Sequence, residues 1–299
     1  MNVTVSWQRR IWAYSFSLPR WFALPVAVLS VLLGGILFHA EALPLALAVL
    51  SSCFMMAFAH TWNSFHDWIT GFDQGPEAER SHEKPYTGGQ NLIGKGIVSL
   101  RETLMVAMVY LLVSAALIAP ISLLTTSWVW LPWGLAALCA PLYSWGKLSY
   151  LCELFLGMGF GPLAVMLGAA ASRDFDFLRA FLAGVPFGLA FGYAAEVVDQ
   201  YLDADVNLAK GLRNLGALAY QHGLGLTLPL GTIIGITILA HVGLTTGGIL
   251  KLQTMLALLT LPGLVMLARR FERRDQSAIM VGLGLICGFS LLLVFLQAT

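Results

Sequence analysis

The sequence predicts an all-α membrane protein with nine transmembrane helices in a single bundle around a central cavity. Of its 299 residues, 58% are hydrophobic and 11% are charged, and the mean hydropathy is +0.77. Soluble domains are roughly 45–50% apolar and about 25% charged. The apolar residues also gather in nine runs. Each run is close to the length of about 20 residues that a spanning helix needs. These observations exclude a soluble globular enzyme.

The expected spans cover the whole chain, which is predicted to form one domain, 1–299. They are expected at 21–40, 43–66, 103–122, 126–145, 150–172, 177–200, 222–244, 250–268 and 277–298. The first run follows Arg9, Arg10 and Arg20, just as basic residues precede the apolar part of a signal peptide. It is longer than the roughly 7–15 apolar residues of a signal peptide, so we expect a retained helix.

Basic residues predict the orientation of the bundle in the cell (inner) membrane, because they mark the cytoplasmic side. With the N-terminus inside and the C-terminus outside, fourteen of the 17 Lys and Arg residues are cytoplasmic. The polar segments at about 67–102 and 201–221 are then cytoplasmic loops. The net charge of +1 gives no reason to expect a nucleic-acid partner.

Ten of the 16 acidic residues lie in two stretches, 67–102 and 196–205, which form or lead into these two cytoplasmic segments. In the first, Asn63 and Asp67 are four residues apart, so they share one face at the end of the second span. Gly71 is expected to end this helix and to turn the chain, so that Asp73 returns toward the same space. The first segment therefore predicts a cluster of oxygen ligands at the cytoplasmic end of a helix.

A second acidic motif ends the sixth span, where Asp199 and Asp203 are also four residues apart. Carboxylates at membrane depth are costly unless they are paired, hydrated or bound to a metal. Mg²⁺ typically binds one or two carboxylates together with substrate phosphate oxygens. We therefore predict that the two acidic clusters face each other and form a Mg²⁺–diphosphate site at the inner face of the membrane.

Basic residues in the same loops supply the charge that a bound diphosphate needs. Those expected at the site are Lys84, Lys147, Lys210 and Arg213. Other readings are simpler: carboxylates at helix ends are often solvated, and Arg or Lys at helix ends often anchors topology. Two spaced acidic motifs, one with an Asn a turn earlier, favour a functional site.

The acidic motifs resemble those of the UbiA superfamily of intramembrane prenyltransferases, and the resemblance covers nearly the whole chain. The family pattern N-x-x-x-D with a later Asp is matched by Asn63, Asp67 and Asp73. The family pattern D-x-x-x-D after the sixth helix is matched by Asp199 and Asp203. Together these motifs are specific, whereas any one of them alone is not.

A Tyr-x-x-x-Lys pattern of the same family, between the fourth and fifth helices, is matched by Tyr143 and Lys147. The resemblance implies Mg²⁺-dependent transfer of a prenyl group from an isoprenyl diphosphate to an aromatic, quinone-precursor-like acceptor. It also implies that the prenyl tail extends between helices into membrane lipid. The implied catalytic residues are Asp67, Asp199 and Lys147, and the implied metal ligands are Asp67, Asp73, Asp199 and Asp203. The implied substrate-binding residues are Asn63, Tyr143, Lys84, Lys210 and Arg213.

Within the superfamily, the step from Asp67 to Asp73 with Gly71 between them resembles the menaquinone-pathway (dihydroxynaphthoate) branch. Ser64 departs from the pattern because an Asp is common there. The departures that concern the acceptor are Ala195 and Glu196, which stand where that branch usually has two Asn residues.

Two alternatives to this interpretation stay open. A cation or proton-coupled transporter would carry polar residues through the helix centres, whereas the acidic residues of this chain gather at one face. A catalytically altered UbiA-like protein with a non-quinone acceptor is suggested by Ser64 and the missing Asn pair. The four retained aspartates argue against a loss of catalysis.

Overall fold

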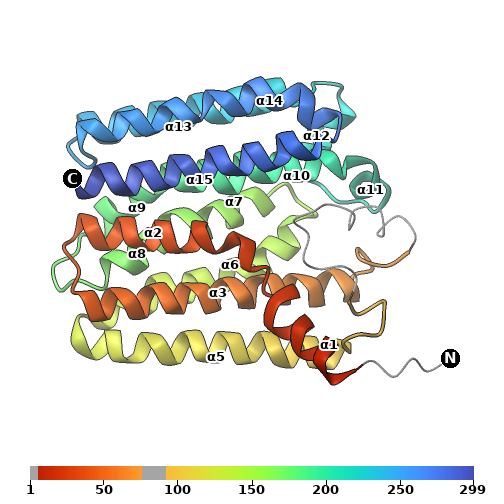
Figure 1. The fold of residues 1–299 in the computed structure, drawn as a ribbon, viewed down its shortest axis with the longest axis horizontal. Helices are drawn as coiled ribbons and strands as arrows, with labels where there is room; N and C mark the ends of the chain where they lie inside the picture. The colour runs from red at the N-terminus through yellow and green to blue at the C-terminus, as the bar shows by residue number, and fades with distance from the viewer. Residues whose placement is uncertain (1–5, 76–91) are drawn as a thin grey trace.

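The computed structural model describes residues 6–75 and 92–299, and every regular element in these ranges is helical (Figure 1). The α-helices are α1 (Trp7–Trp12), α2 (Leu24–Leu37), α3 (Ala42–Ile69), α5 (Leu100–Leu124), α6 (Trp130–Gly146), α7 (Cys152–Met158), α8 (Ala164–Ala169), α9 (Phe177–Phe187), α10 (Glu196–Leu202), α11 (Ala204–Ala209), α12 (Leu215–Gln221), α13 (Thr227–Thr246), α14 (Pro262–Glu272) and α15 (Gln276–Ala298). The predicted all-α class is confirmed for the described residues.

Short segments of tighter or wider helix extend several of these elements. A π-helical segment, η4 (Gly159–Leu163), joins α7 to α8, and another, η5 (Gly188–Ala195), joins α9 to α10. A 3₁₀ segment, η6 (Leu252–Thr260), precedes α14. Pro162 lies within η4 and Pro186 lies just before η5; proline removes a backbone donor and so favours an altered helical pattern.

Within the described residues, seven helical segments are long and apolar enough to cross a membrane. They are Ala42–Ile69, Leu100–Leu124, Cys152–Ala169, Phe177–Leu202, Thr227–Thr246, Leu252–Glu272 and Gln276–Ala298. The spans expected at 21–40 and 126–145 contain the shorter helices α2, of 14 residues, and α6, of 17 residues. That the chain crosses the membrane nine times stays a prediction.

The long helices lie side by side along the longest axis of the molecule, and α1 and the C-terminus lie at opposite ends (Figure 1). Helix α2 packs against α3, α8 and α15, so it connects the N-terminal helix α3 with the C-terminal helix α15. The largest apolar core links α2 to the helices from α8 to α10 and from α13 to α15. The short helices α11 and α12 lie at the same end as α1, which we call the polar end.

Glycines bring the backbone of α7–η4 into direct contact with that of α9–η5. A Cβ on Gly192 would lie 2.0 Å from the Cα of Gly157, and one on Gly161 would lie 2.4 Å from the backbone N of Gly188. These glycines recur at four-residue spacing, the small-residue pattern that lets membrane helices approach closely. This contact fixes the position of α10, which follows η5 directly.

The second polar segment, 201–221, which is predicted to connect two spans on the cytoplasmic side, contains short helices. Helices α11 and α12 occupy most of it, and the Asn214 side chain caps α12 by accepting a hydrogen bond from Ala217 N at 2.7 Å. Val206, Leu212 and Ala217 are buried. These apolar residues give the short helices a core face, so the segment packs onto the end of the bundle.

Candidate functional site

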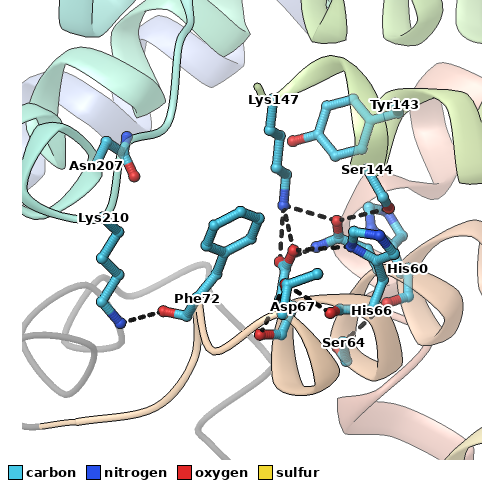
Figure 2. Close-up of polar contacts among 12 residues, drawn as sticks. His60, Ser64, His66, Asp67, Phe72, Tyr143, Ser144, Lys147, Asn207 and Lys210 are labelled. Atoms are coloured by element: carbon cyan, nitrogen blue, oxygen red, sulfur yellow. Dashed lines mark hydrogen bonds and ion pairs between the residues drawn. The ribbon is translucent and has the colours of Figure 1, made fainter. Parts of the chain in front are cut away.

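The end of α3 and the end of α6 meet in a buried ion pair between Asp67 and Lys147 (Figure 2). Lys147 Nζ donates to both carboxylate oxygens of Asp67, at 2.8 and 2.7 Å, and to Asn63 Oδ1 at 2.8 Å. Asn63 Nδ2 in turn donates to Asp67 Oδ2 at 2.8 Å. The predicted spacing of Asn63 and Asp67 on one helix face is therefore confirmed, and the two side chains share one cation.

The pair is almost fully removed from water, since Asp67 and Lys147 are each 7% exposed. A buried charge is tolerated only when it is paired and hydrogen-bonded. Ser144, one turn before Lys147 on α6, completes the cluster by donating to Asn63 Oδ1 at 3.5 Å. The site therefore contains a balanced charge pair that was not predicted, although both of its members were.

Gly71 turns the chain after α3 as predicted. Its φ of +82° lies in the left-handed region that favours glycine. The backbone N of Asp73 donates to Asp67 O at 3.1 Å, which returns Asp73 to the end of the helix. Burial raises the pKa of Asp73 to about 7, and the charge of Asp67 adds to this effect.

Lys210 holds this turn from the other side of the polar end. Its Nζ donates to the backbone carbonyls of Phe72, of Gln74 at 2.7 Å and of Gly71 at 3.3 Å. In Figure 2 the Phe72 side chain lies between Lys210 and the Asp67–Lys147 pair. Lys210 thus positions the turn that carries Asp73. Its ammonium group, which was predicted to bind substrate, donates its hydrogen bonds to these backbone carbonyls instead.

A second polar layer connects α6 to α10. Tyr143 OH donates to Glu196 Oε1 at 2.7 Å, and Gln200 Nε2 donates to the same oxygen at 2.5 Å. Gln200 Oε1 accepts from Asn207 Nδ2 at 2.8 Å and from Asn214 Nδ2 at 2.9 Å. Because Asn207 and Asn214 both donate to the side-chain carbonyl of Gln200, the NH₂ group of Gln200 points toward Glu196.

The second acidic motif lies next to this layer, on α10. Asp199 and Asp203 are half-buried. Asp199 lines a pocket whose other walls are apolar and come from η5 and α10 on one side and from α14 and α15 on the other. The remaining lining residues are Ala194, Ala195, Val198, Leu264, Phe271, Ile279, Gly282, Leu283 and Ile286.

Two of the predicted basic residues are not placed within this cluster. The backbone of Arg213 joins the site, because Arg213 N donates to Lys147 O at 2.5 Å, but the residue is exposed. Lys84 lies outside the described residues. Among the predicted basic residues that the structure describes, Lys147 forms an ion pair with Asp67 of the first motif.

The donor chemistry of the site fits Mg²⁺, because Asp67, Asp73, Asp199 and Asp203 supply carboxylate oxygens from two helix ends. In the part of the chain that the structure describes, no three or more His, Cys, Asp or Glu residues gather closely enough to hold a metal ion by themselves. Mg²⁺ commonly keeps several waters and substrate phosphates among its ligands. The metal assignment of the four aspartates stays a prediction.

Sequence reasoning did not single out Gln200, Asn207 and Asn214, and it recorded Glu196 only as an acidic residue that departs from a family pattern. All four are buried. A sequence signal did exist, because Gln200 follows Glu196 by one helical turn, so the two side chains share a helix face.

No family model matches the sequence, and no curated protein matches it. Solved structures do match. The apo structure of a UbiA homolog from Aeropyrum pernix K1 has a TM-score of 0.70 and 17% identity, covering 92% of this chain and 98% of that one. A UbiA homolog from Archaeoglobus fulgidus bound to DMAPP and Mg²⁺ has a TM-score of 0.60 and 15% identity, covering 93% and 98%. The same homolog bound to GPP and Mg²⁺ gives 0.58 and 15%, with the same coverage.

These comparisons define the class of fold. Over nearly its whole length, this chain has the helical fold of the UbiA homologs. The fold that the resemblance implied is therefore confirmed.

Proposed function

We propose that this protein transfers a prenyl group from an isoprenyl diphosphate to an aromatic acceptor within the membrane, with Mg²⁺ as cofactor. The observation that carries the proposal is the buried cluster of Asn63, Asp67 and Lys147 at the polar end. It supplies both a carboxylate for a metal and an ammonium for a phosphate. The fold is shared with a homolog bound to DMAPP or GPP and Mg²⁺, which supports the same reading.

The two acidic motifs would hold the metal through Asp67, Asp73, Asp199 and Asp203. When bound, Mg²⁺ neutralises diphosphate charge and so favours its departure. Lys147 supplies a fixed positive charge, because Asn63 and Asp67 hold its ammonium in place. Lys84 and Arg213 would add positive charge around the leaving group. Lys210 would add its charge from the turn that it holds through backbone carbonyls.

In this proposal the prenyl chain lies along the apolar side chains beside Asp199. The pocket begins at a carboxylate of the acidic motif and continues between α10, α14 and α15 over apolar side chains. A chain bound there has its diphosphate at the acidic motif and its tail between membrane helices. Such a lining also keeps water away from the reacting carbon.

The reaction balances without a redox partner. The allylic C–O bond breaks, and diphosphate leaves with its electron pair. An electron-rich ring carbon then forms the new C–C bond, and the ring loses the proton from that carbon. The chain's own contribution is to orient the diphosphate through Lys147 and to exclude water around the prenyl group.

We further propose that the polar end faces the cytoplasm of a cell with this protein in its inner membrane, and that the whole chain works as one unit. The excess of basic residues on the predicted inner segments supports this orientation. The spacing of Asp67, Gly71 and Asp73 favours an acceptor of the kind used in quinone pathways, with the menaquinone branch as the nearest pattern.

The test is a transfer assay with the purified full-length protein in lipid nanodiscs. Isoprenyl diphosphates of increasing length are combined with Mg²⁺ and a panel of aromatic acceptors, and prenylated products are detected by mass spectrometry. We expect Mg²⁺-dependent product that EDTA abolishes and added Mg²⁺ restores. Asp67→Ala and Asp199→Ala should each lower kcat/KM by at least about a hundredfold.

Asp174→Ala is the matched control, because Asp174 is an exposed aspartate of the turn between α8 and α9 and belongs to neither acidic motif. It should retain wild-type activity. No product with any acceptor, together with no Mg²⁺-dependent binding of isoprenyl diphosphate, would contradict the proposal. Unchanged activity of Asp67→Ala or Asp199→Ala would contradict the assignment of the metal site.

A further inference from the structure

Glu196 lies one helical turn deeper in the bundle than the charged side chains of Asp199 and Lys147. It precedes Asp199 by three residues on α10, and Tyr143 precedes Lys147 by four residues at the end of α6. Residues at these spacings share a helix face. The Tyr143–Glu196 contact therefore lies one turn deeper in the bundle than Lys147 and Asp199.

That level is where an acceptor has to lie if the proposed function is correct. The diphosphate would be held by the outer layer, formed by the acidic motifs and Lys147. The reacting carbon, and the ring that attacks it, would then lie on the inner side of this layer. The polar groups of the inner layer, Tyr143 and Glu196, are the ones available to a ring bound there.

The surroundings of Glu196 define what it can bind. Its Oε1 accepts both protein hydrogen bonds, from Tyr143 and from Gln200, while no described residue donates a hydrogen bond to its Oε2. Gln200 cannot turn its carbonyl toward Glu196, because Asn207 and Asn214 both donate to that carbonyl. Tyr143 and Gln200 therefore hold Glu196 through one oxygen, and within residues 6–75 and 92–299 its other oxygen accepts no hydrogen bond.

The charges near Glu196 are also informative. Asp199 and Glu153 act on it as neighbouring acidic groups, and Glu153 is fully buried. The nearest buried cation of α6, Lys147, is paired with Asp67. This layer thus favours a neutral hydroxyl donor and disfavours an anionic substituent, because a buried anion without a cation is costly.

We propose that Glu196 determines acceptor specificity: its Oε2 accepts a hydrogen bond from a ring hydroxyl and the layer rejects acceptors that carry a carboxylate. Gln200 is the positioning residue that holds the carboxylate through its amide. This assignment rests on the proposed function and deepens it. It departs from the acceptor of the dihydroxynaphthoate branch, which carries a carboxylate.

The test compares three acceptors with one isoprenyl diphosphate: naphthol, methoxynaphthalene and hydroxynaphthoate. For the wild-type protein we expect kcat/KM to be highest with naphthol, by on the order of tenfold or more over methoxynaphthalene, which lacks the donor. Hydroxynaphthoate should be used more slowly than naphthol. Equal use of naphthol and methoxynaphthalene by the wild type overturns the assignment, whatever the variants show.

Glu196→Gln tests the residue itself, because glutamine keeps the shape and an oxygen for Tyr143 and Gln200 but turns the second oxygen into a donor. We expect the naphthol preference to fall by about tenfold and the relative use of hydroxynaphthoate to rise. The KM for isoprenyl diphosphate should stay within about threefold of the wild type. A purely structural link between α6 and α10 would not change the ratio between acceptors.

The possible failures are distinguishable. If Glu196→Gln transfers prenyl groups with the wild-type acceptor ratio, the role of Glu196 is wrong and the proposed function stands. If the variant raises only the KM for isoprenyl diphosphate, Glu196 belongs to the diphosphate layer and the assignment is overturned. If the wild type transfers to no acceptor, both the proposed function and the assignment fail.

Discussion

The carboxylate of Asp67 and the ammonium of Lys147 are 80 residues apart in sequence and form one buried ion pair, with Nζ within 2.8 Å of both carboxylate oxygens. The pair joins the end of α3 to the end of α6. It also connects the two groups that the sequence assigns to opposite tasks, one to the metal and one to the phosphate. If a magnesium diphosphate binds here as proposed, the hydrogen bonds between Asp67 and Lys147 have to rearrange when it binds.

Removing one member of the pair should destabilise the protein, since the other charge is left buried. We expect Lys147→Met to cost about 3–5 kcal/mol, which thermal unfolding in detergent detects as a lowered Tm. The double variant Asp67→Asn, Lys147→Met should recover much of this loss while both variants remain inactive. A wild-type Tm for Lys147→Met alone would show that the pair is not buried.

Gly71 should tolerate asparagine better than alanine, because its φ of +82° is accessible to Asn and strained for Ala. No atom lies within 4 Å of a Cβ added there, so sterics do not obscure the comparison. We expect Gly71→Ala to lower activity by raising the Mg²⁺ concentration needed for half-maximal rate, and Gly71→Asn to do so less. Equal effects of the two substitutions would contradict a conformational role.

Lys210→Met should loosen the turn that carries Asp73, because it removes a donor to the carbonyls of Gly71, Phe72 and Gln74. The expected result is a rise in the KM for isoprenyl diphosphate on the order of tenfold. Steady-state kinetics at several Mg²⁺ concentrations measures it. Lys95→Met, which replaces an exposed lysine at the polar end, is the control and should behave as the wild type.

Gly192→Ala should displace η5 from α7, because the new Cβ would lie 2.0 Å from the Cα of Gly157. Overpacking of this kind costs about 1–3 kcal/mol or more, and the displacement should also reduce transfer activity. Gly231→Ala in α13 has no atom within 4 Å of the new Cβ and should be neutral or stabilising by up to about 1 kcal/mol. Similar Tm changes in the two variants would argue against the backbone contact.

The sequence was sufficient for features that depend on neighbouring residues. Apolar runs predicted where helices lie, since each run corresponds to a helix such as α3 or α15. The four-residue spacing of Asn63 and Asp67 predicted their shared face, and Gly71 predicted the return of Asp73. Each of these follows from helical periodicity or from the conformational freedom of glycine.

The features that the sequence did not predict depend on contacts between distant segments. The pairing of Lys147 with Asp67, the bonds from Lys210 to the turn at Phe72, and the Tyr143–Glu196 contact all join residues that helix packing brings together. The helices within 201–221 were missed because polar residues outweigh a short apolar face in a hydropathy reading. Asn214 shows the difference, as it is both a helix cap and part of the buried amide network.

The two layers of the site lie on successive turns of the same two helices, α6 and α10. If Glu196 recognises the acceptor as proposed, a substitution in the inner layer would alter acceptor recognition without moving the helix turns that carry Lys147 and Asp199. Under that proposal, the choice of aromatic acceptor and the handling of the diphosphate are separable properties of one helix pair, so the first could be changed by substitution while the second is kept.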